Sequence, residues 1–386
     1  MEFDRRQFCR AASVGTFGGV FASSQAGLAA EETQQKSRTV DPSVQKRTGP
    51  FGEGLPITLA GYEYKRVRGL VDGSVTIDGC THQFEVSSIG PLNNHAFFNP
   101  QTRDVTELGL IPYILAYCND DFRDYTLLPI PILRLFRHKS IFVRTDRGIE
   151  KPEDLRGKRV ATVGYSSSGL THVRGILQEE YAVHPNEIEW VSTKKDSGGN
   201  LTGGVSNWEK IRPEGIRIVD AAPDEDESTL LIQGKVDAIL HPAEPKVYQD
   251  RNPLVARLFV DHKSVEQEFY KRTGVFPIMH SLAIRKEASQ KNPWLAKAVF
   301  EAYSRAKHLD YEYSQSLGWV MDSLPWYGQE FEETRKLMGE NFYPYGLKAS
   351  ASSYKTALRY VYDQGLSKRK VSLEEMFENS TLALEE

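Results

Sequence analysis

One continuous stretch, a strand pattern followed by a serine-rich loop and an amphipathic helix, limits the folds that this chain can adopt. The strand pattern is Lys158–Val163, whose β-branched residues are typical of a buried parallel strand. The loop Ser166–Gly169 supplies a helix N-cap, and a helical pattern follows over Leu170–Tyr181. The start of such a helix offers free backbone N–H groups and the positive end of the helix dipole. The stretch therefore predicts an α/β protein that holds a small acidic molecule where a helix begins.

Strands and helices alternate along most of the remaining chain, which predicts mostly parallel sheets. At 386 residues the chain is long enough for two lobes. Further strands are expected at Pro56–Ala60, Val75–Ile77, Val86–Gly90, Leu127–Leu133, Ser140–Val143, Ile188–Val191, Ile216–Val219, Val236–Leu240 and Ile278–Ile284. Further helices are expected at Tyr62–Leu70, Leu108–Cys118, Glu227–Gln233, Trp294–Tyr313, Phe331–Met338 and Ser353–Gln364, with loops over Asn93–Arg103 and Ser197–Asn207.

The first thirty residues have the pattern of a twin-arginine export signal. Arg5 and Arg6 precede a short, weakly apolar run over residues 11–22 and small residues near Ala29. This pattern predicts a periplasmic protein that meets the twin-arginine translocase during export. The polar segment 31–56 is expected to be a disordered lead-in.

Composition excludes several classes of protein. Lys and Arg number 48 against 52 Asp and Glu, and no basic stripe indicates nucleic-acid binding. No phosphate loop, dinucleotide fingerprint or metal-ligand spacing is present, so neither a cofactor nor a metal is expected. The mature chain would keep Cys80 and Cys118, either as a disulfide or as two thiols.

Several long segments resemble the 4,5-dihydroxyphthalate decarboxylase family. The resemblance covers roughly residues 57–370. It is carried by FRHKSIFVR (Phe136–Arg144), PEDLRGKRV (Pro152–Val160), the VRGILQEEYAV run, RLFVDHKSVEQEFYKRTGVFPIMH (Arg257–His280), PWLAKAVFEAYSRAK (Pro293–Lys307) and LPWYGQEFEETRKLMGENFYPYGL (Leu324–Leu347). The family pattern differs at Val163–Tyr165, where Pro-Glu-Tyr is usual, and over Asn93–Asp104, where an Arg-Met pair is missing.

The resemblance implies the type 2 periplasmic-binding-protein-like fold, in which ligand lies between two α/β lobes. Their mixed, mostly parallel sheets would be joined by two crossover strands, near Ser140–Arg144 and Met279–Ile284. Lobe 1 would then be discontinuous, with residues 57–142 and 280–386, and lobe 2 would span residues 143–279.

Basic residues near the first crossover are candidates for holding a carboxylate, because a guanidinium pairs with it in a bidentate way. Arg134 and Arg137 are assigned to substrate binding, and His138 to catalysis. The second catalytic candidate is His280, at the second crossover, where it would either meet the ligand or stabilise the junction. The alternative for Arg134, Arg137 and His138 is a solvated basic turn.

The serine-rich loop supplies the other substrate-binding candidates. They are Tyr165, Ser166, Ser167, Ser168, Thr171 and Arg174, and His241 joins them because it ends a strand at a ligand-binding edge. Helix capping needs only one of these serines, and a structural turn is the alternative for His241.

Two functions remain open at this point. The resemblance implies non-oxidative decarboxylation of a hydroxylated aromatic carboxylate, with no cofactor. The export signal and the fold favour instead a solute-binding protein that delivers an aromatic or other small carboxylate to a membrane transporter. A binder of a pyrimidine-like thiamine precursor is a third reading, because that group shares the fold.

Overall fold

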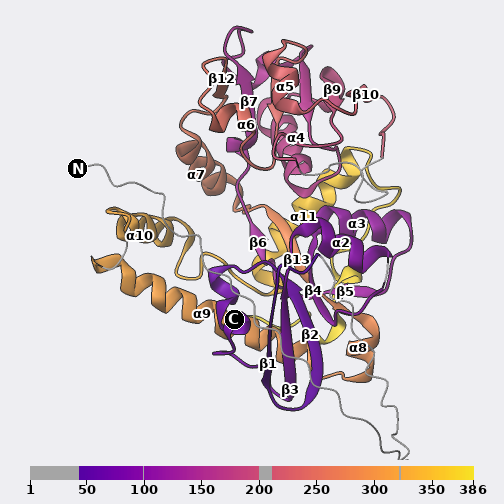
Figure 1. The fold of residues 1–386 in the computed structure, drawn as a ribbon, viewed down its shortest axis with the longest axis vertical. Coiled ribbons are helices and arrows are strands. Elements are labelled where there is room, and N and C mark those ends of the chain that lie inside the picture. The colour runs from indigo at the N-terminus through magenta and orange to yellow at the C-terminus, as the bar shows by residue number, and fades with distance from the viewer. Residues whose placement is uncertain (1–42, 99, 200–210, 321–322) are drawn as a thin grey trace, which may run out of the picture. The chain divides into compact units, whose positions relative to one another are not determined.

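The computed structural model describes residues 43–98, 100–199, 211–320 and 323–386, with the side chains of residues 318–320 left out. The predicted export signal and most of the loop at Ser197–Asn207 lie outside these described residues. Residues 41–386 form one unit that contains two β-sheets. Figure 1 shows helices around both sheets.

The first sheet combines the early strands of the chain with one late strand. It contains β1 (Lys46–Gly52), β2 (Leu55–Gly61), β3 (Cys80–Val86), β4 (Val105–Gly109), β5 (Tyr125–Leu127), β6 (Leu133–Arg134) and β13 (Ile278–Arg285). The order is β1-β3-β2-β4-β13-β5, and β6 also pairs with β13. Strand β2 runs parallel to β3 and β4, whereas β1 and β13 are antiparallel to their neighbours.

The second sheet is built from the middle of the chain. It contains β7 (Ile141–Arg144), β8 (Arg159–Thr162), β9 (Glu189–Ser192), β10 (Ile218–Asp220), β11 (Ala238–Leu240) and β12 (Val255–Arg257), in the order β10-β9-β8-β11-β7-β12. Strands β8, β9, β10 and β11 are parallel, and β7 is antiparallel to β11 and β12. The predicted pair of mixed sheets is therefore confirmed. The second sheet is mostly parallel as expected, whereas most strand pairs of the first sheet are antiparallel.

Helices cover the sheets and connect them. They are α1 (Arg68–Asp72), α2 (Ile89–Phe98), α3 (Leu110–Asn119), α4 (Ser168–Tyr181), α5 (Glu227–Ile232), α6 (Lys246–Gln249), α7 (His262–Thr273), α8 (Lys286–Lys291), α9 (Leu295–Val320), α10 (Tyr327–Met338) and α11 (Leu347–Asp363). Short 3₁₀ helices include η1 (Lys65–Val67), η2 (His138–Ser140) and η6 (Glu374–Met376). One apolar core is shared by strands of both sheets and by α3, α4 and α11.

The chain passes between the sheets slightly outside the predicted crossover strands. Strand β7 belongs wholly to the second sheet and β13 to the first. The passages are the segments between β6 and β7 and between β12 and β13, and the second passage contains α7. Helix α11 contacts the start of the first passage and the end of the second. Ser353 Oγ accepts from Arg134 Nη2, at the end of β6, at 2.9 Å and from Phe276 N at 3.2 Å.

Five local expectations are corrected. The expected disordered lead-in contains β1, an edge strand mostly exposed on both faces, which therefore lacks the apolar alternation of a half-buried strand. Val75–Ile77 is not a strand, and the strand expected at Val86–Gly90 ends at Val86. The loop expected at Asn93–Arg103 is largely α2, whose Pro91 lies in the first turn, where proline is tolerated. The Leu127–Leu133 strand is divided between β5 and β6.

Cys80 and Cys118 are both free thiols, so the disulfide alternative is not realised in this structure. Cys80 is buried and Cys118 partly buried. Among the described helices, none is both long and apolar enough to cross a membrane.

Candidate functional site

The carboxyl ends of the parallel strands define the candidate site, because open α/β sheets bind ligands at this edge. In the first sheet β2 and β4 end at Gly61 and Gly109, and in the second sheet β8 ends at Thr162. The two edges are in contact, since Ile111 N donates to Ser168 Oγ at 3.1 Å. The N-termini of α3 and α4 therefore meet, and two positive helix ends lie together.

The three serines at the start of α4 have three different environments. Ser167 is the N-cap, and its Oγ accepts from Leu170 N at 3.4 Å. Ser168 Oγ is used by α3, as described above. Ser166 is 1% exposed, and its Oγ has no hydrogen-bond partner among the described residues. A buried hydroxyl without a partner is costly, so Ser166 is the serine best placed to meet a ligand.

Arg137 lies where three elements of this edge converge. Its Nη1 donates to Pro242 O at 2.6 Å, and its Nε donates to Met279 Sδ of β13 at 3.0 Å. A Cβ added at Gly169, in the first turn of α4, would lie 3.0 Å from the Arg137 Cζ atom. Arg137 is 5% exposed and forms no ion pair within the described parts of the chain. Burial lowers its pKa to about 10, so the guanidinium stays charged at neutral pH and suits an anionic ligand.

Arg134 is buried differently, at the end of β6, directly before the first passage between the sheets. Its Nε donates to Phe276 O at 3.1 Å, its Nη2 bonds Ser353, and its guanidinium lies 5.0 Å from the Phe276 ring centroid. Only Nη1 lacks a hydrogen-bond partner in the described residues. These contacts fix the passage against α11, and substrate contact by Arg134 stays a prediction.

His280 forms a buried pair with Glu107 of β4. The His280 Nδ1 atom lies 2.5 Å from Glu107 Oε1. The same carboxylate accepts from Tyr64 Oη at 2.7 Å and from the backbone N of Tyr62 at 3.0 Å. Glu107 is 1% exposed, and a Cβ at Gly61 would lie 3.0 Å from its Oε2. The carboxylate is therefore held from several sides and fixes the orientation of the imidazole.

The other nitrogen of His280 remains available. Nε2 makes no hydrogen bond within the described residues, and the His280 side chain is 12% exposed. The Tyr62 ring lies beside the imidazole, with centroids 5.8 Å apart. A carboxylate–histidine pair with one free ring nitrogen can deliver or accept a proton.

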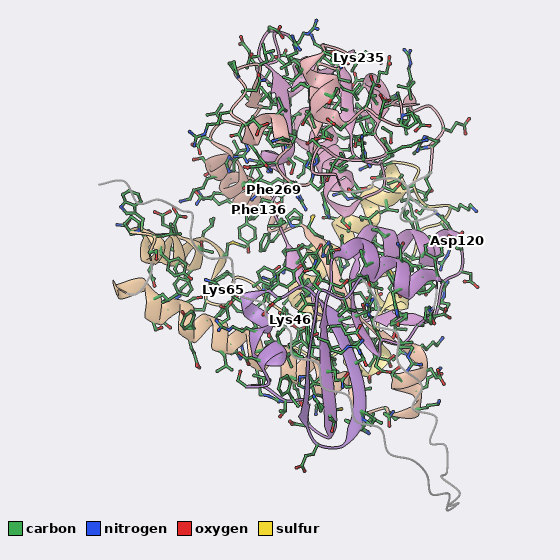
Figure 2. All side chains as sticks on the ribbon, in the orientation of Figure 1. Lys46, Lys65, Asp120, Phe136, Lys235 and Phe269 are labelled. Atoms are coloured by element: carbon green, nitrogen blue, oxygen red, sulfur yellow. The ribbon has the colours of Figure 1, made fainter. Side chains whose placement is uncertain are left out.

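His138, the other predicted catalytic histidine, lies in an apolar cluster under α7. Its ring makes edge contacts with Phe259 and Phe269, at centroid distances of 5.5 and 5.2 Å. Phe269, together with Phe136 packed against the same cluster, is labelled in Figure 2. Burial, reinforced by the positive charges of Arg272 and His262, lowers the pKa of His138 to about 4. The ring is therefore neutral at pH 7 and is placed for packing rather than for proton donation.

Three further predicted contacts pack behind the α4 loop. Arg174 Nη2 donates to the Tyr165 carbonyl and to Thr171 Oγ1 at 3.3 Å. Its guanidinium lies 3.8 Å from the Tyr165 ring centroid, and its Nε donates to Gln364 at 2.9 Å. The Tyr165 hydroxyl is buried with no partner among the described residues. Arg174 and Thr171 thus brace the loop, and their direct contact with substrate stays a prediction.

His241 ends β11 on the second sheet's side of the site. Its Nδ1 accepts from Ala243 N at 3.0 Å, so a neutral ring carries its proton on Nε2. Nε2 lies 3.9 Å from Asp196 Oδ2 and 4.0 Å from Glu227 Oε1. In the described part of the chain, no group of three or more His, Cys, Asp or Glu side chains is arranged to hold a metal ion.

Two relatives with known names show the family of this chain. A protein called 4,5-dihydroxyphthalate decarboxylase from Comamonas testosteroni is 32% identical over 331 residues, covering 85% of this chain and 98% of that protein. Another of the same name, from Pseudomonas putida, is 30% identical over 220 residues, covering 56% of this chain and 82% of that protein. The chain belongs to the 4,5-dihydroxyphthalate decarboxylase family. The predicted resemblance is thereby confirmed.

Two further comparisons concern the fold of this decarboxylase-family chain. Residues 132–212 match the family described as NMT1/THI5 like. A putative sulfonate ABC transporter protein of Methylobacillus flagellatus KT, a periplasmic sulfonate-binding protein, has a similar solved structure. Its TM-score is 0.50 at 15% identity, over 85% of this chain and 92% of that one. The predicted type 2 periplasmic-binding-protein-like fold is confirmed.

Sequence reasoning missed Glu107, Tyr62 and Tyr64, the partners of His280 in this family member. Glu107 lies in Val105–Gly109, which was not expected to be a strand because its two polar residues are adjacent and give no alternation of polar and apolar positions. The usable signal was the carboxylate itself, since a glutamate in a strand buried along its whole length requires partners. The tyrosines follow the first parallel strand, at the edge where ligands bind.

Proposed function

We propose that this chain catalyses non-oxidative decarboxylation of a hydroxylated aromatic dicarboxylate, with 4,5-dihydroxyphthalate as the first candidate substrate. The observation that carries the proposal is the buried Glu107–His280 pair. It lies on the sheet edge whose partner edge bears Arg137 and the start of α4. A proton donor and an unpaired buried cation are the two groups that this reaction requires. The names of the relatives support the substrate class.

The chemistry explains the need for a proton donor. A proton from His280 Nε2 adds to the ring carbon that bears the departing carboxylate. The bond from that carbon to the carboxylate carbon then breaks, its electron pair restores the aromatic ring, and carbon dioxide leaves. The hydroxyl para to this carbon stabilises the cationic intermediate. From 4,5-dihydroxyphthalate the products are 3,4-dihydroxybenzoate and carbon dioxide, with no oxidant or reductant consumed.

The protein groups have distinct roles in this proposal. Glu107 holds Nδ1 of His280, so that Nε2 faces the ring. Arg137, the Ser166 hydroxyl and the first amides of α4 hold the carboxylate that stays. Tyr62, beside the imidazole, supplies an aromatic wall. Ser167 caps α4, and Ser168 joins α4 to α3. The remaining candidates have a supporting role around the site: His241, Arg134, Thr171, Arg174 and Tyr165.

Export to the periplasm belongs to the same proposal. It is supported by Arg5 and Arg6 and the weakly apolar run that follows them. Replacement of both arginines by lysine should leave the protein in the cytoplasm, as judged by cell fractionation and immunoblotting. Periplasmic recovery of the lysine variant would exclude the twin-arginine translocase as its route.

The function is tested by mixing the purified protein with 4,5-dihydroxyphthalate and measuring released carbon dioxide and 3,4-dihydroxybenzoate by chromatography. Turnover that His280→Gln abolishes is the expected result. Saturable binding without product would overturn decarboxylation in favour of an exported receptor that serves a membrane transporter. If the protein shows no turnover and no binding, both the proposed reaction and the proposed ligand class are overturned.

A further inference from the structure

A cavity of about 410 Å³ lies apart from the strand edges, between η1, α9 and α10. It borders the candidate site through one residue, because Tyr64 lines the cavity and its hydroxyl donates to Glu107. Lys65, labelled in Figure 2, lines the cavity from η1. The volume falls within the range of small-molecule pockets and exceeds what one benzene ring occupies.

Aromatic side chains form one part of the wall of this cavity. Tyr311 and Phe342 are stacked, with centroids 4.6 Å apart, and Phe331 meets Phe342 edge-on at 5.7 Å. Tyr327 extends the wall from the start of α10, where it stacks on Phe331. Rings in these orientations leave flat apolar surfaces that suit another aromatic ring.

Charged and polar side chains form the rest of the lining. Glu330 is one of them and is paired with Lys263, whereas Arg66 and Asp310 form no such ion pair within the described residues. The Arg66 guanidinium lies between the rings of Tyr64 and Tyr343, 4.1 and 4.5 Å from their centroids. Its Nε donates to Ile132 O at 2.9 Å, but it forms no ion pair within the described residues. Asp310 is partly buried, and burial raises its pKa although Arg66 and Lys65 lower it. The cavity therefore offers a charge for a carboxylate and an acceptor for a hydroxyl.

We propose that this cavity is a second binding site, for a hydroxylated aromatic monocarboxylate, the product class of the reaction proposed above. The ligand's ring lies against Phe331 and Phe342, its carboxylate faces Arg66, and a phenol hydroxyl donates to Asp310. The ligand class rests on the proposed function, whereas the existence of the site rests on the cavity and its lining. Through Tyr64, the occupied site contacts the group that orients His280.

The number of sites is measured by equilibrium dialysis of the full chain against 3,4-dihydroxybenzoate, which carries no second carboxylate to lose. Two equivalents are expected for the unaltered protein. Thr334→Trp fills the cavity from α10 and should leave one equivalent. The control Lys336→Trp places the same side chain on the exposed face of α10 and should keep two. Asp310→Asn, which preserves shape, should weaken one of the two equivalents about tenfold.

The outcomes separate this inference from the proposed function, because binding is counted without turnover. One equivalent in every chain overturns the second site. A single equivalent that Thr334→Trp removes also overturns it, because the cavity would then be the only ligand site. If Thr334→Trp does not fold, the test rests on Asp310→Asn. Two equivalents bound by that variant with unchanged affinity would overturn the role assigned to Asp310. A protein that binds two equivalents but releases no carbon dioxide retains the second site and loses the proposed reaction.

Discussion

At the scale of single residues, two histidines that were both predicted to be catalytic have different surroundings in the structure. His280 has a carboxylate partner and a free nitrogen, whereas His138 is surrounded by phenylalanine rings. His280→Gln should therefore lower kcat by about 10²- to 10⁴-fold, the usual contribution of a positioned acid or base. His138→Leu, the matched control, should change kcat little. Steady-state kinetics would contradict this assignment if His138→Leu were the inactive variant.

Buried histidines also predict how stability depends on pH. Burial lowers the pKa of His138 to about 4 and that of His172 to about 3, both below the unfolded value of about 6.5. As the pH falls, the histidines of the unfolded chain bind protons at a higher pH than those of the folded chain. Stability is therefore retained above pH 6.5 and lost as the pH falls toward 4. Each histidine should contribute a slope of up to about 1.4 kcal/mol per pH unit. Denaturant unfolding at pH 7, 6 and 5 measures it, and a slope unchanged in His138→Leu would contradict the role of that ring.

At the scale of elements, adjacent serines of the α4 loop should differ in what they support. Ser167→Ala removes the N-cap and should destabilise the fold by about 1 kcal/mol, with little effect on ligand affinity. Ser166→Ala removes a hydroxyl without a described partner, so stability should hold while substrate affinity falls. Thermal melts and substrate titrations of both variants test the pair. The reverse pattern would assign the ligand contact to Ser167.

The elements that sequence could predict are those with buried apolar runs. The strands β8, β11 and β13 and the helix α4 were expected within a few residues of their observed limits, because burial on both faces leaves a readable pattern. Strand β1 was missed because pairing with β3, and not an apolar face, holds it in place. Helix α7 was missed as a helix because its sequence is largely charged. Arg137 and Ser166 could be chosen as candidates from residue type and position, but Glu107 needed the pairing of β4 with β13.

At the scale of the whole molecule, an ion-pair cluster links elements that follow different sheets. Lys263 of α7 lies 2.7 Å from Glu330 and 2.9 Å from Glu333, both on α10. Lys263→Glu should weaken substrate binding about two- to fivefold at low salt, because exposed pairs contribute little. The effect should fade in high salt.

The control for that prediction lies on the same helix. Lys271→Glu makes the same charge change, but within the described residues Lys271 pairs only with Glu268, one turn away. Ligand titrations at two salt concentrations compare the variants. Equal losses in both would show that the net charge of α7, and not its link to α10, controls affinity.

The sheet order has a consequence for the order in which this protein can acquire structure during synthesis. Every strand of the second sheet lies between residues 141 and 257, so that sheet can assemble as soon as this stretch has left the ribosome. The first sheet has β4 and β5 early but needs β13, from residues 278–285, between them. Until β13 arrives, β4 and β5 have unpaired edges, which are prone to wrong association. The lobe that the chain begins first is thus the lobe that it finishes last.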